Sequence, residues 1–293
     1  MSRAARLSVA AAQMAPVRAD LAENLARHRA LIADARGQGA RVIVFPELSL
    51  TGYQVGPRVP ELAMAATDSR LATLARDAGD DYVLVGFVEE DRAARFFNAV
   101  ALLHRGAVVA CHRKHALPTY GNLDEGKYFA PGRSLLTCAL PGGFTAAPLI
   151  CADLWDPALV HAAAVSGATL LLAPANSALD AVSEEFSNPG GWSTVLDFYA
   201  LVYGLPIVFC NRVGQEGGAS FWGGSRILDP GGACLVTAPA GAEAAEAVIV
   251  AELDFERVRR ARFELPTVRD ADPGPAARAG LTLTQIDLDR STE

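Results

Sequence analysis

The chain has 293 residues, of which 51% are hydrophobic and 20% charged, so it can bury a large core and is not intrinsically disordered. Its 33 acidic and 26 basic residues leave a net charge of −7, which argues against nucleic acid or an anionic membrane as the main partner. No apolar run approaches the roughly 18–20 residues that a membrane-spanning helix needs, so no membrane partner is expected.

The N-terminus and the cysteines indicate the cellular compartment. Residues 1–7 are basic but lack the long apolar stretch and the cleavage site of a signal peptide. An odd number of irregularly spaced cysteines argues against a disulfide framework. They are Cys111, Cys138, Cys151, Cys210 and Cys234. We therefore expect a reduced, cytoplasmic protein.

Apolar, strand-like runs alternate with alanine-rich helical stretches along the chain. Strands are predicted at residues 7–14, 41–45, 82–88, 96–103, 107–113, 145–150, 169–172, 206–210, 225–228, 233–237 and 247–253. Helices are predicted at residues 21–36, 69–78, 158–166 and 192–203, and after Asp254. Asp20 is the expected N-cap of the first helix, and Gly37 follows its end. Strand–helix units mixed with consecutive strands predict an α/β fold.

The domain organisation follows from what the sequence lacks between these elements. We find no linker rich in Pro, Gly or Ser, no internal repeat and no low-complexity block. One domain over residues 1–265 is therefore predicted. Residues 266–293 are polar, contain Pro273 and Pro275, and are expected to form a C-terminal arm or tail.

Three predicted strands end on side chains that can take part in catalysis. Glu47 follows the strand at 41–45, Lys114 follows the strand at 107–113, and Cys151 follows the strand at 145–150. In α/β sheets, ligands bind in the crevice at the carboxyl ends of the strands. The three ends therefore predict one pocket that holds a carboxylate, an ammonium group and a thiol.

The chemistry of this trio is coherent. A thiol with an ordinary pKa of about 8.5 is mostly protonated at neutral pH and needs a base or a cation beside it. Glu47 can accept its proton, and Lys114 can stabilise the thiolate and then the oxyanion of a tetrahedral intermediate. One well-placed donor of that kind is worth about 3–4 kcal/mol in acyl-transfer sites. The trio predicts acyl transfer through a thioester.

The segments around these residues resemble a known family. Residues 45–53 (FPELSLTGY), 113–132 (RKHALPTYGNLDEGKYFAPG) and 149–157 (LICADLWDP) are similar, in order and spacing, to the three catalytic signatures of the nitrilase superfamily of carbon–nitrogen hydrolases. Residues 211–214 (NRVG) and 221–232 (FWGGSRILDPGG) also resemble that family. The resemblance covers residues 7–254, nearly the whole chain.

The resemblance implies a fold and a set of roles. The fold would be a single-domain, four-layer α-β-β-α sandwich. Glu47 would be the general base, Lys114 the stabiliser of oxyanion and thiolate, and Cys151 the nucleophile. Glu125 matches a second glutamate of the family, which would orient Lys114 or the attacking water. The backbone N–H of Ala152 would be the second oxyanion donor.

The residues around the three signatures indicate which subgroup of the family the chain resembles. Residues 117–125 are most similar to the glutaminase domains of glutamine-dependent NAD synthetases, yet the sequence contains no nucleotide-binding loop of either S-G-G-x-D-S or G-x-x-x-x-G-K-[ST] form. Those glutaminases tend to carry an acidic residue directly after the cysteine, where this chain has Ala152. Residues 211–214 and 221–225 are more similar to stand-alone amidases and N-carbamoyl-amine hydrolases. An amide is therefore favoured over a nitrile as the scissile group.

Other residues complete the expected site. Tyr53, Tyr120, Trp155 and Trp222 lie in or beside these segments and are expected to line the substrate pocket. Asp153 and Asp156 are expected to cap the following helix. The histidines and cysteines show no metal-ligand spacing, so neither a metal nor a cofactor is expected. The resemblance also implies a homodimer or a higher homo-oligomer.

These observations predict a cysteine-dependent hydrolase of a non-peptide C–N bond in a small linear amide or an N-carbamoyl compound, with release of ammonia. One alternative is a glutaminase-like subunit that supplies ammonia to a separate ATP-dependent synthetase. A second is a catalytically silent scaffold, against which the intact set of Glu47, Lys114, Glu125 and Cys151 argues. Acyl transfer to an amine would use the same thioester.

Overall fold

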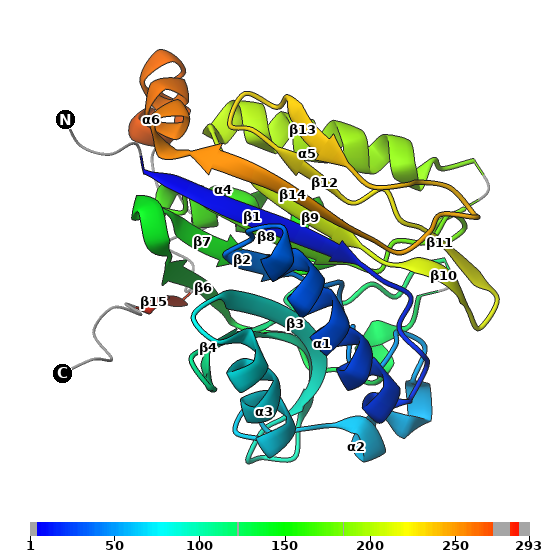
Figure 1. Ribbon diagram of the computed structural model, residues 1–293. Coiled ribbons are helices and arrows are strands. Elements are labelled where there is room, and N and C mark those ends of the chain that lie inside the picture. The colour runs from blue at the N-terminus through cyan, green and yellow to red at the C-terminus, as the bar shows by residue number, and fades with distance from the viewer. Residues whose placement is uncertain (1–4, 122, 184, 272–281, 287–293) are drawn as a thin grey trace.

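Two β-sheets form the centre of the molecule (Figure 1). The computed structural model describes residues 5–121, 123–183, 185–271 and 282–286. The first sheet has the order β14–β1–β2–β3–β4–β5, with β14 at Ala247–Asp254, β1 at Arg6–Gln13, β2 at Val42–Val44, β3 at Tyr82–Glu90, β4 at Phe96–His104 and β5 at Ala107–Arg113. The second has the order β13–β12–β9–β8–β7–β6–β15, with β13 at Cys234–Thr237, β12 at Arg226–Leu228, β9 at Ile207–Asn211, β8 at Leu170–Ala175, β7 at Thr145–Pro148, β6 at Ser134–Ala139 and β15 at Thr282–Ile286. Strands β10 (Val213–Glu216) and β11 (Ala219–Trp222) form a separate hairpin.

Helices cover the outer faces of both sheets (Figure 1). Helices α1 (Leu21–Gly37) and α3 (Ser69–Ala78) pack on the first sheet, and α4 (Pro157–Val165) and α5 (Asn188–Tyr203) pack on the second. The short α2 (Val59–Leu62), α6 (Phe255–Glu264) and α7 (Thr267–Asp270) complete the helices of the described residues. The predicted α-β-β-α sandwich is therefore confirmed.

The alternation of side chains along the strands explains these layers. On β1, Leu7, Val9 and Ala11 face the core between the two sheets, whereas Ala10 and Ala12 face the core beneath α1 and α3. Successive side chains of a strand point to opposite faces, so both faces of a central strand must be apolar to be buried. This is why β1 reads as an almost continuous apolar run.

Most predicted elements are present within a residue or two of their expected ends. Helix α1 begins after Asp20, whose carboxylate accepts the Glu23 N–H at 3.0 Å as an N-cap should. Strands β6, β10 and β11 and helix α2 were not expected from the sequence pattern. In the predicted tail, α7 contacts α4 and α5, and β15 pairs in parallel with β6. The division of the chain at residue 265 remains a prediction, and residues 272–281 and 287–293 lie outside the described part.

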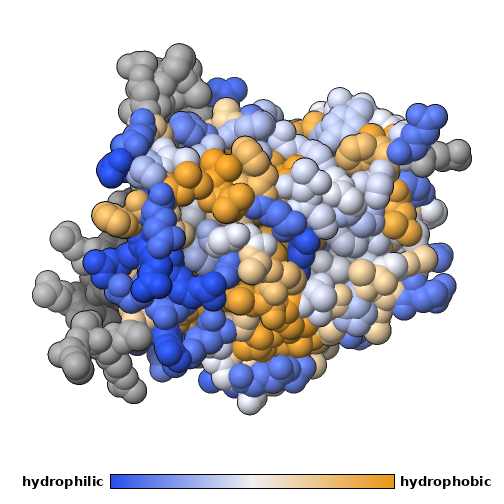
Figure 2. Space-filling model, turned by 90° about the horizontal axis from the view of Figure 1, so that it is seen from above, coloured by the Kyte–Doolittle hydropathy of each residue, from blue (hydrophilic) through white to orange (hydrophobic). Residues whose placement is uncertain are grey.

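The surface carries one feature relevant to assembly. Figure 2 shows apolar side chains gathered on the face seen from above, the side on which α6 and β13 lie in Figure 1. Leu235 on β13 and Phe263 on α6 are large apolar side chains with 40% and 81% of their surface exposed.

Among the described residues, no helix combines the length and the apolar character needed to cross a membrane.

Gly86 on β3 allows the turn after β2 to lie against the sheet. A Cβ atom at this position would lie 2.2 Å from the Leu48 nitrogen and 2.6 Å from the Pro46 carbonyl oxygen. The same turn is held by hydrogen bonds from the Leu50 N–H to the Gly86 carbonyl (2.9 Å) and from the Gly86 N–H to Ser49 Oγ (3.1 Å). The backbone around Glu47 is therefore fixed by direct contact with β3.

His28 supports this turn from the helical side. Its Nε2 lies 2.9 Å from Ser49 Oγ, its Nδ1 lies 2.7 Å from the Asn24 carbonyl oxygen, and its ring stacks on Phe45. Full burial lowers the pKa of His28 to about 4. The imidazole is therefore neutral in the folded protein at neutral pH.

We predict that Gly86→Ala lowers the free energy of unfolding by about 1–3 kcal/mol, because backbone atoms rather than a flexible side chain must move away from the new methyl group. Urea denaturation measures the effect. The control is Gly37→Ala, because a Cβ at Gly37 in α1 meets nothing within 4 Å. That change is expected to stabilise the protein slightly. Equal effects of the two substitutions would contradict the close approach at Gly86.

We predict that His28 makes the stability depend on pH. The unfolded chain binds a proton below its ordinary pKa of about 6.5, whereas the folded protein does so only near pH 4, so stability falls as pH decreases across this window. The full effect of the shift is about 3 kcal/mol. Urea denaturation of the wild type and of His28→Gln at several pH values tests this. The difference between the two proteins should shrink toward acidic pH, and parallel curves would show that His28 does not titrate as described.

Candidate active site

The turns after three strands bring Glu47, Lys114 and Cys151 together, as the sequence predicted. Glu47 lies three residues beyond β2, and Lys114 directly follows β5. Cys151 is the first residue of a short 3₁₀ turn, Cys151–Trp155, that follows β7. Leu48 and Cys151 have φ angles of 45° and 46°, in the left-handed region that non-glycine residues rarely adopt. The turns at Leu48 and at Cys151 are therefore strained and depend on surrounding contacts to keep their shape.

The Lys114 ammonium group is the centre of the site. Its Nζ donates to Glu47 Oε1 at 2.6 Å and to both carboxylate oxygens of Glu125, at 2.7 and 2.8 Å. The Lys114 side chain is completely buried. Burial alone would lower its pKa, but Glu125 and Glu47 outweigh burial and raise the pKa well above its usual value. Lys114 is therefore a permanent cation in this site.

Glu47 keeps one carboxylate oxygen free. Its Oε1 accepts from Lys114 Nζ and from Asn98 Nδ2, at 2.6 and 2.7 Å. Its Oε2 is buried and has no hydrogen-bond partner among the described residues. A fixed carboxylate with one unengaged oxygen has the geometry of a general base.

The resting thiol of Cys151 is neutral. Burial raises its pKa well above the usual value, and the negative charge of Glu47 raises it further, although Lys114 opposes this. The backbone N–H of Asn176 donates to the thiol and also favours the thiolate. Because the charges balance this way, Lys114 does not produce a standing thiolate, and attack by Cys151 requires a base to remove the proton.

Glu125 is held from two sides. Besides Lys114, the Tyr53 hydroxyl donates to its Oε1 at 2.6 Å. Burial is the largest influence on Glu125 and raises its pKa to about 7, with Lys114 opposing and Glu47 adding to the rise. Glu125 therefore titrates in the neutral range, while Tyr53, whose pKa is raised by burial and by Glu125, stays protonated as a donor.

A cavity of about 260 Å³ opens at Cys151. Tyr53, Tyr120 and Trp155 line it, as expected from the sequence, and Ala152, the expected backbone oxyanion donor, lines it too. Its other lining residues are Pro118, Leu123, Glu125, Asn176, Ser177, Ala181, Val182, Phe186, Asn188 and Trp192. Trp222 lies behind this wall instead of in it, because its indole Nε1 donates to Ser177 Oγ at 3.0 Å and its side chain is buried. The cavity is the place where a substrate carbonyl can meet the thiol.

The comparison with protein families identifies the chain. Residues 8–263 match the family model described as carbon-nitrogen hydrolase. The chain belongs to this family. It is an enzyme of the amidase and nitrilase type, and the resemblance of its three signature segments to the nitrilase superfamily is confirmed.

Relatives of this hydrolase have different substrates. It is 31% identical over 268 residues to the glutamine-dependent NAD(+) synthetase of Thermotoga maritima, covering 90% of this chain and 45% of that protein. It is 28% identical over 289 residues to the N-carbamoylputrescine amidase of Solanum lycopersicum, covering 93% and 95%. The chain spans about half the length of the NAD(+) synthetases that it matches.

A solved structure supports the fold. The amidase of Nesterenkonia AN1, from the nitrilase superfamily, is 26% identical and superposes with a TM-score of 0.74, covering 90% of this chain and 97% of that one. In contrast to the synthetases, the stand-alone amidase and this chain therefore match over nearly their whole lengths.

Two asparagines that the sequence did not single out support this site. Asn98 on β4 donates to Glu47 Oε1 and, at 3.3 Å, to Glu125 Oε2, so it bridges the two carboxylates. Asn176 follows β8, and its Nδ2 donates to the Glu47 carbonyl oxygen at 2.7 Å. The available signal for Asn98 was a polar residue inside the apolar run at residues 96–103 of β4.

The segment at 211–214 has a supporting role. The Arg212 guanidinium is buried and donates to Glu216 Oε2 at 2.7 Å. Glu216 Oε1 in turn accepts the Tyr53 N–H at 2.8 Å. This ion pair holds the loop that carries Tyr53, which donates to Glu125.

Asp153 connects the turn after Lys114 with the turn that carries Cys151. Asp156 caps α4, accepting the Ala158 N–H at 2.9 Å, whereas Asp153 caps only the 3₁₀ helix at Cys151–Trp155, where it accepts the Ile150 N–H at 3.0 Å. Asp153 also accepts the backbone N–H groups of His115 (2.9 Å) and Ala116 (2.8 Å). It therefore ties the turn after Lys114 to the turn that presents Cys151.

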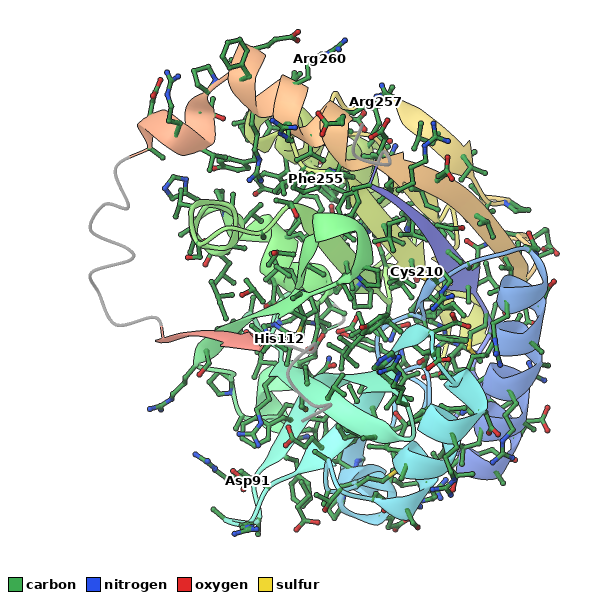
Figure 3. All side chains as sticks on the ribbon, turned by 60° about the vertical axis from the view of Figure 1, so that its left-hand side comes forward. Asp91, His112, Cys210, Phe255, Arg257 and Arg260 are labelled. Carbon is green, nitrogen blue, oxygen red and sulfur yellow. The ribbon has the colours of Figure 1, made fainter. Side chains whose placement is uncertain are left out.

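Two histidines lie beside this carboxylate. The possible ligand atoms of His112, His115 and Asp153 lie within 4.8 Å of one another, and Figure 3 shows His112 in the interior of the molecule. His112 Nε2 is 3.6 Å from Asp153 Oδ2. Although burial opposes it, the His112 contact lowers the pKa of Asp153, aided by the N–H groups. Because three N–H groups already occupy the carboxylate, the arrangement fits a structural link better than a metal centre.

We predict that Asp153→Asn lowers the free energy of unfolding by about 1–3 kcal/mol, since the amide NH₂ would face backbone N–H donors. It should also slow alkylation of Cys151 by iodoacetamide, measured by peptide mass spectrometry. Asp156→Asn is the matched control, because asparagine caps a helix as well as aspartate does, so little change is expected. Unchanged stability and alkylation in Asp153→Asn would contradict the linking role.

Proposed function

We propose that this hydrolase cleaves the C–N bond of an amide or an N-carbamoyl compound through a covalent intermediate on Cys151 and releases ammonia. The observation that carries the proposal is the free, buried Oε2 of Glu47 beside a neutral thiol, with its other oxygen fixed by Lys114 and Asn98. This arrangement supplies a base close to a nucleophile that lines the cavity. Lys114 supplies the neighbouring cation.

The reaction follows from these positions. Glu47 takes the Cys151 proton as sulfur bonds to the carbonyl carbon, and the carbonyl oxygen gains the negative charge. The Lys114 ammonium and the Ala152 N–H stabilise that oxyanion. The C–N bond then breaks, Glu47 returns the proton to nitrogen, and ammonia leaves a thioester. Water attacks the thioester, Glu47 accepts its proton, and the proton passes to the departing sulfur.

In this series of reaction steps, Glu125 positions other groups. It holds two of the contacts of Lys114 Nζ and also lines the cavity. From there it orients the ammonium group toward the oxyanion, and the attacking water toward the thioester. Tyr53 and Asn98 in turn fix the Glu125 carboxylate.

A glutaminase-like subunit is the second candidate. The 31% identity to the NAD(+) synthetase of Thermotoga maritima favours it. Ala152 lines the cavity at the position where a carboxylate next to the thiol could hold the ammonium group of glutamine. For this reason we place a simple amide or carbamoyl compound ahead of glutamine. The intact catalytic set argues against a silent scaffold.

Three further expectations remain predictions. The five cysteines form no disulfide, which supports a reducing, cytoplasmic compartment. The exposed apolar side chains on β13 and α6 support a homodimer or higher homo-oligomer. A small-molecule amide is the expected partner at the site.

We predict that purified protein releases ammonia from at least one member of a panel of short amides, ω-amides, N-carbamoyl amines, nitriles, asparagine and glutamine. Cys151→Ala and Glu47→Gln should each lower kcat by about 10³-fold or more, because nucleophile and base act as a unit. Cys234→Ala is the matched control, since Cys234 is exposed on β13 and outside the cavity.

The outcomes separate the candidates. Glutamine hydrolysis that rises on addition of an ATP-dependent synthetase would favour the glutaminase-like subunit. Preference for a nitrile would contradict amide hydrolysis. No release from any compound, together with a Cys151 inert to iodoacetamide, would favour the scaffold.

A further inference from the structure

Apolar and aromatic side chains make up most of the lining of the cavity at Cys151, beside the polar residues Glu125, Asn176, Ser177 and Asn188. Trp155, Phe186 and Trp192 form its aromatic wall: the ring of Trp155 meets that of Phe186 at 5.8 Å and that of Trp192 at 5.3 Å, both edge-to-face. Val182 and Pro118 extend the apolar lining. Trp155 and Phe186 are each 36% exposed, although rings of this size are usually buried when nothing is to cover them. This wall is a surface that a ligand can complete.

A glycine in helix α5 makes room for the aromatic wall. A Cβ at Gly191 would lie 2.9 Å from Trp155 Cη2 and 3.0 Å from Phe186 Cζ. Gly191 does not have a positive φ, and glycine inside a helix lowers helix stability. Its presence is therefore explained by the rings that pack on it.

The lining offers no counter-charge for a charged substrate. Among the described residues that line the cavity, Glu125 is the only Asp, Glu, Lys or Arg, and Lys114 already engages both of its oxygens. An ionised group brought into such a cavity would lose its hydration without gaining a partner. The cavity therefore selects against carboxylate and ammonium groups on the acyl side.

A neighbouring recess has the opposite character. It has a volume of about 550 Å³, shares Tyr53 and Glu125 with the cavity, and adds the carboxylates of Asp124 and Asp180. Cys151 does not line it. A cationic group could therefore lie in the recess only at a distance from the thiol, outside the space next to the reacting carbonyl.

We propose that the acyl group accepted at Cys151 is uncharged and apolar and carries a group of about the size of a phenyl ring. The cavity of about 260 Å³ exceeds the ~150 Å³ of an engineered apolar cavity that binds benzene, which leaves room for a ring and a carboxamide. Trp155 and Phe186 are the specificity-determining residues, and they contact the ring of the substrate. This proposal rests on the proposed amide hydrolysis and goes beyond it by defining the substrate class.

The kinetic test compares matched amides. Phenylacetamide, its para-carboxylate, its para-aminomethyl derivative, acetamide and glutamine are assayed by ammonia release. The wild type should have a kcat/KM for phenylacetamide at least about tenfold above that for each of the others. A charged compound or acetamide as the best substrate would overturn the proposal.

Variants of the wall locate the effect. Trp155→Ala and Gly191→Ala should each lower kcat/KM for phenylacetamide by about tenfold or more, mainly through KM, and lower kcat/KM for acetamide by a clearly smaller factor. The control is Phe198→Ala, which removes an exposed ring from the same helix, outside the cavity. Equal losses for both amides in Trp155→Ala and Gly191→Ala would assign the wall a merely structural role.

A binding measurement separates this proposal from amide hydrolysis itself. Calorimetry with Cys151→Ala, which cannot turn over, should show phenylacetamide binding at least about tenfold more tightly than its para-carboxylate. If it does and the wild type releases no ammonia, the proposed reaction fails while the apolar acyl site stands. If the wild type hydrolyses amides but the variant binds both compounds equally or neither, the apolar acyl site fails.

Discussion

The site depends on one buried ammonium group held between two carboxylates. Lys114 has no access to solvent, so its charge is tolerable only because Glu47 and Glu125 lie within 2.8 Å of Nζ. Three charges in this set leave one excess negative charge unless a proton is shared. Burial is the main cause of the raised pKa of Glu125 and of the raised pKa that keeps the Cys151 thiol neutral, and the negative charge of Glu47 adds to both. In the proposed reaction, the Glu47 carboxylate that would act as the base therefore also helps to keep Cys151 protonated before a substrate binds.

The rest of the fold keeps these groups in place. The two catalytic turns have unfavourable φ angles at Leu48 and Cys151, and neither turn can hold its shape alone. Contacts from distant parts of the chain supply the constraint: Gly86 admits one turn against β3, and Asp153 ties the other to the loop after Lys114. Asn176 joins both turns, because its side chain binds the Glu47 carbonyl and its backbone binds the thiol. The sandwich thus acts as a frame that stores strain where the chemistry occurs.

The sequence predicted what depends on local pattern. Apolar alternation indicated the strands, and residues placed directly after strands indicated Glu47, Lys114 and Cys151. It could not predict Asn98 or Asn176, because their partners lie 51 and 129 residues away in the chain. The sequence predicted only the capping role of Asp153, because capping is a local rule, whereas its other N–H partners, His115 and Ala116, lie 38 and 37 residues away in the chain. Trp222 was expected in the pocket because of its neighbours in the sequence. Its indole instead donates to Ser177 Oγ behind the residues that line the cavity.

The apolar cavity and the charged centre belong to one design. Electrostatic stabilisation of an oxyanion by Lys114 is strongest where the dielectric is low and water is excluded. An apolar acyl group that covers Trp155 and Phe186 would lower the dielectric further at the moment when the oxyanion forms. A zwitterionic substrate would instead bring two charges of its own and require counter-charges close to Lys114, which would weaken the effect of that cation. In this chain, the residue after Cys151 is an alanine and the wall is aromatic. Neither the alanine nor the aromatic wall adds a charge. The Lys114 ammonium and the two carboxylates would therefore be the principal source of the electric field at the carbonyl group of a substrate bound at Cys151.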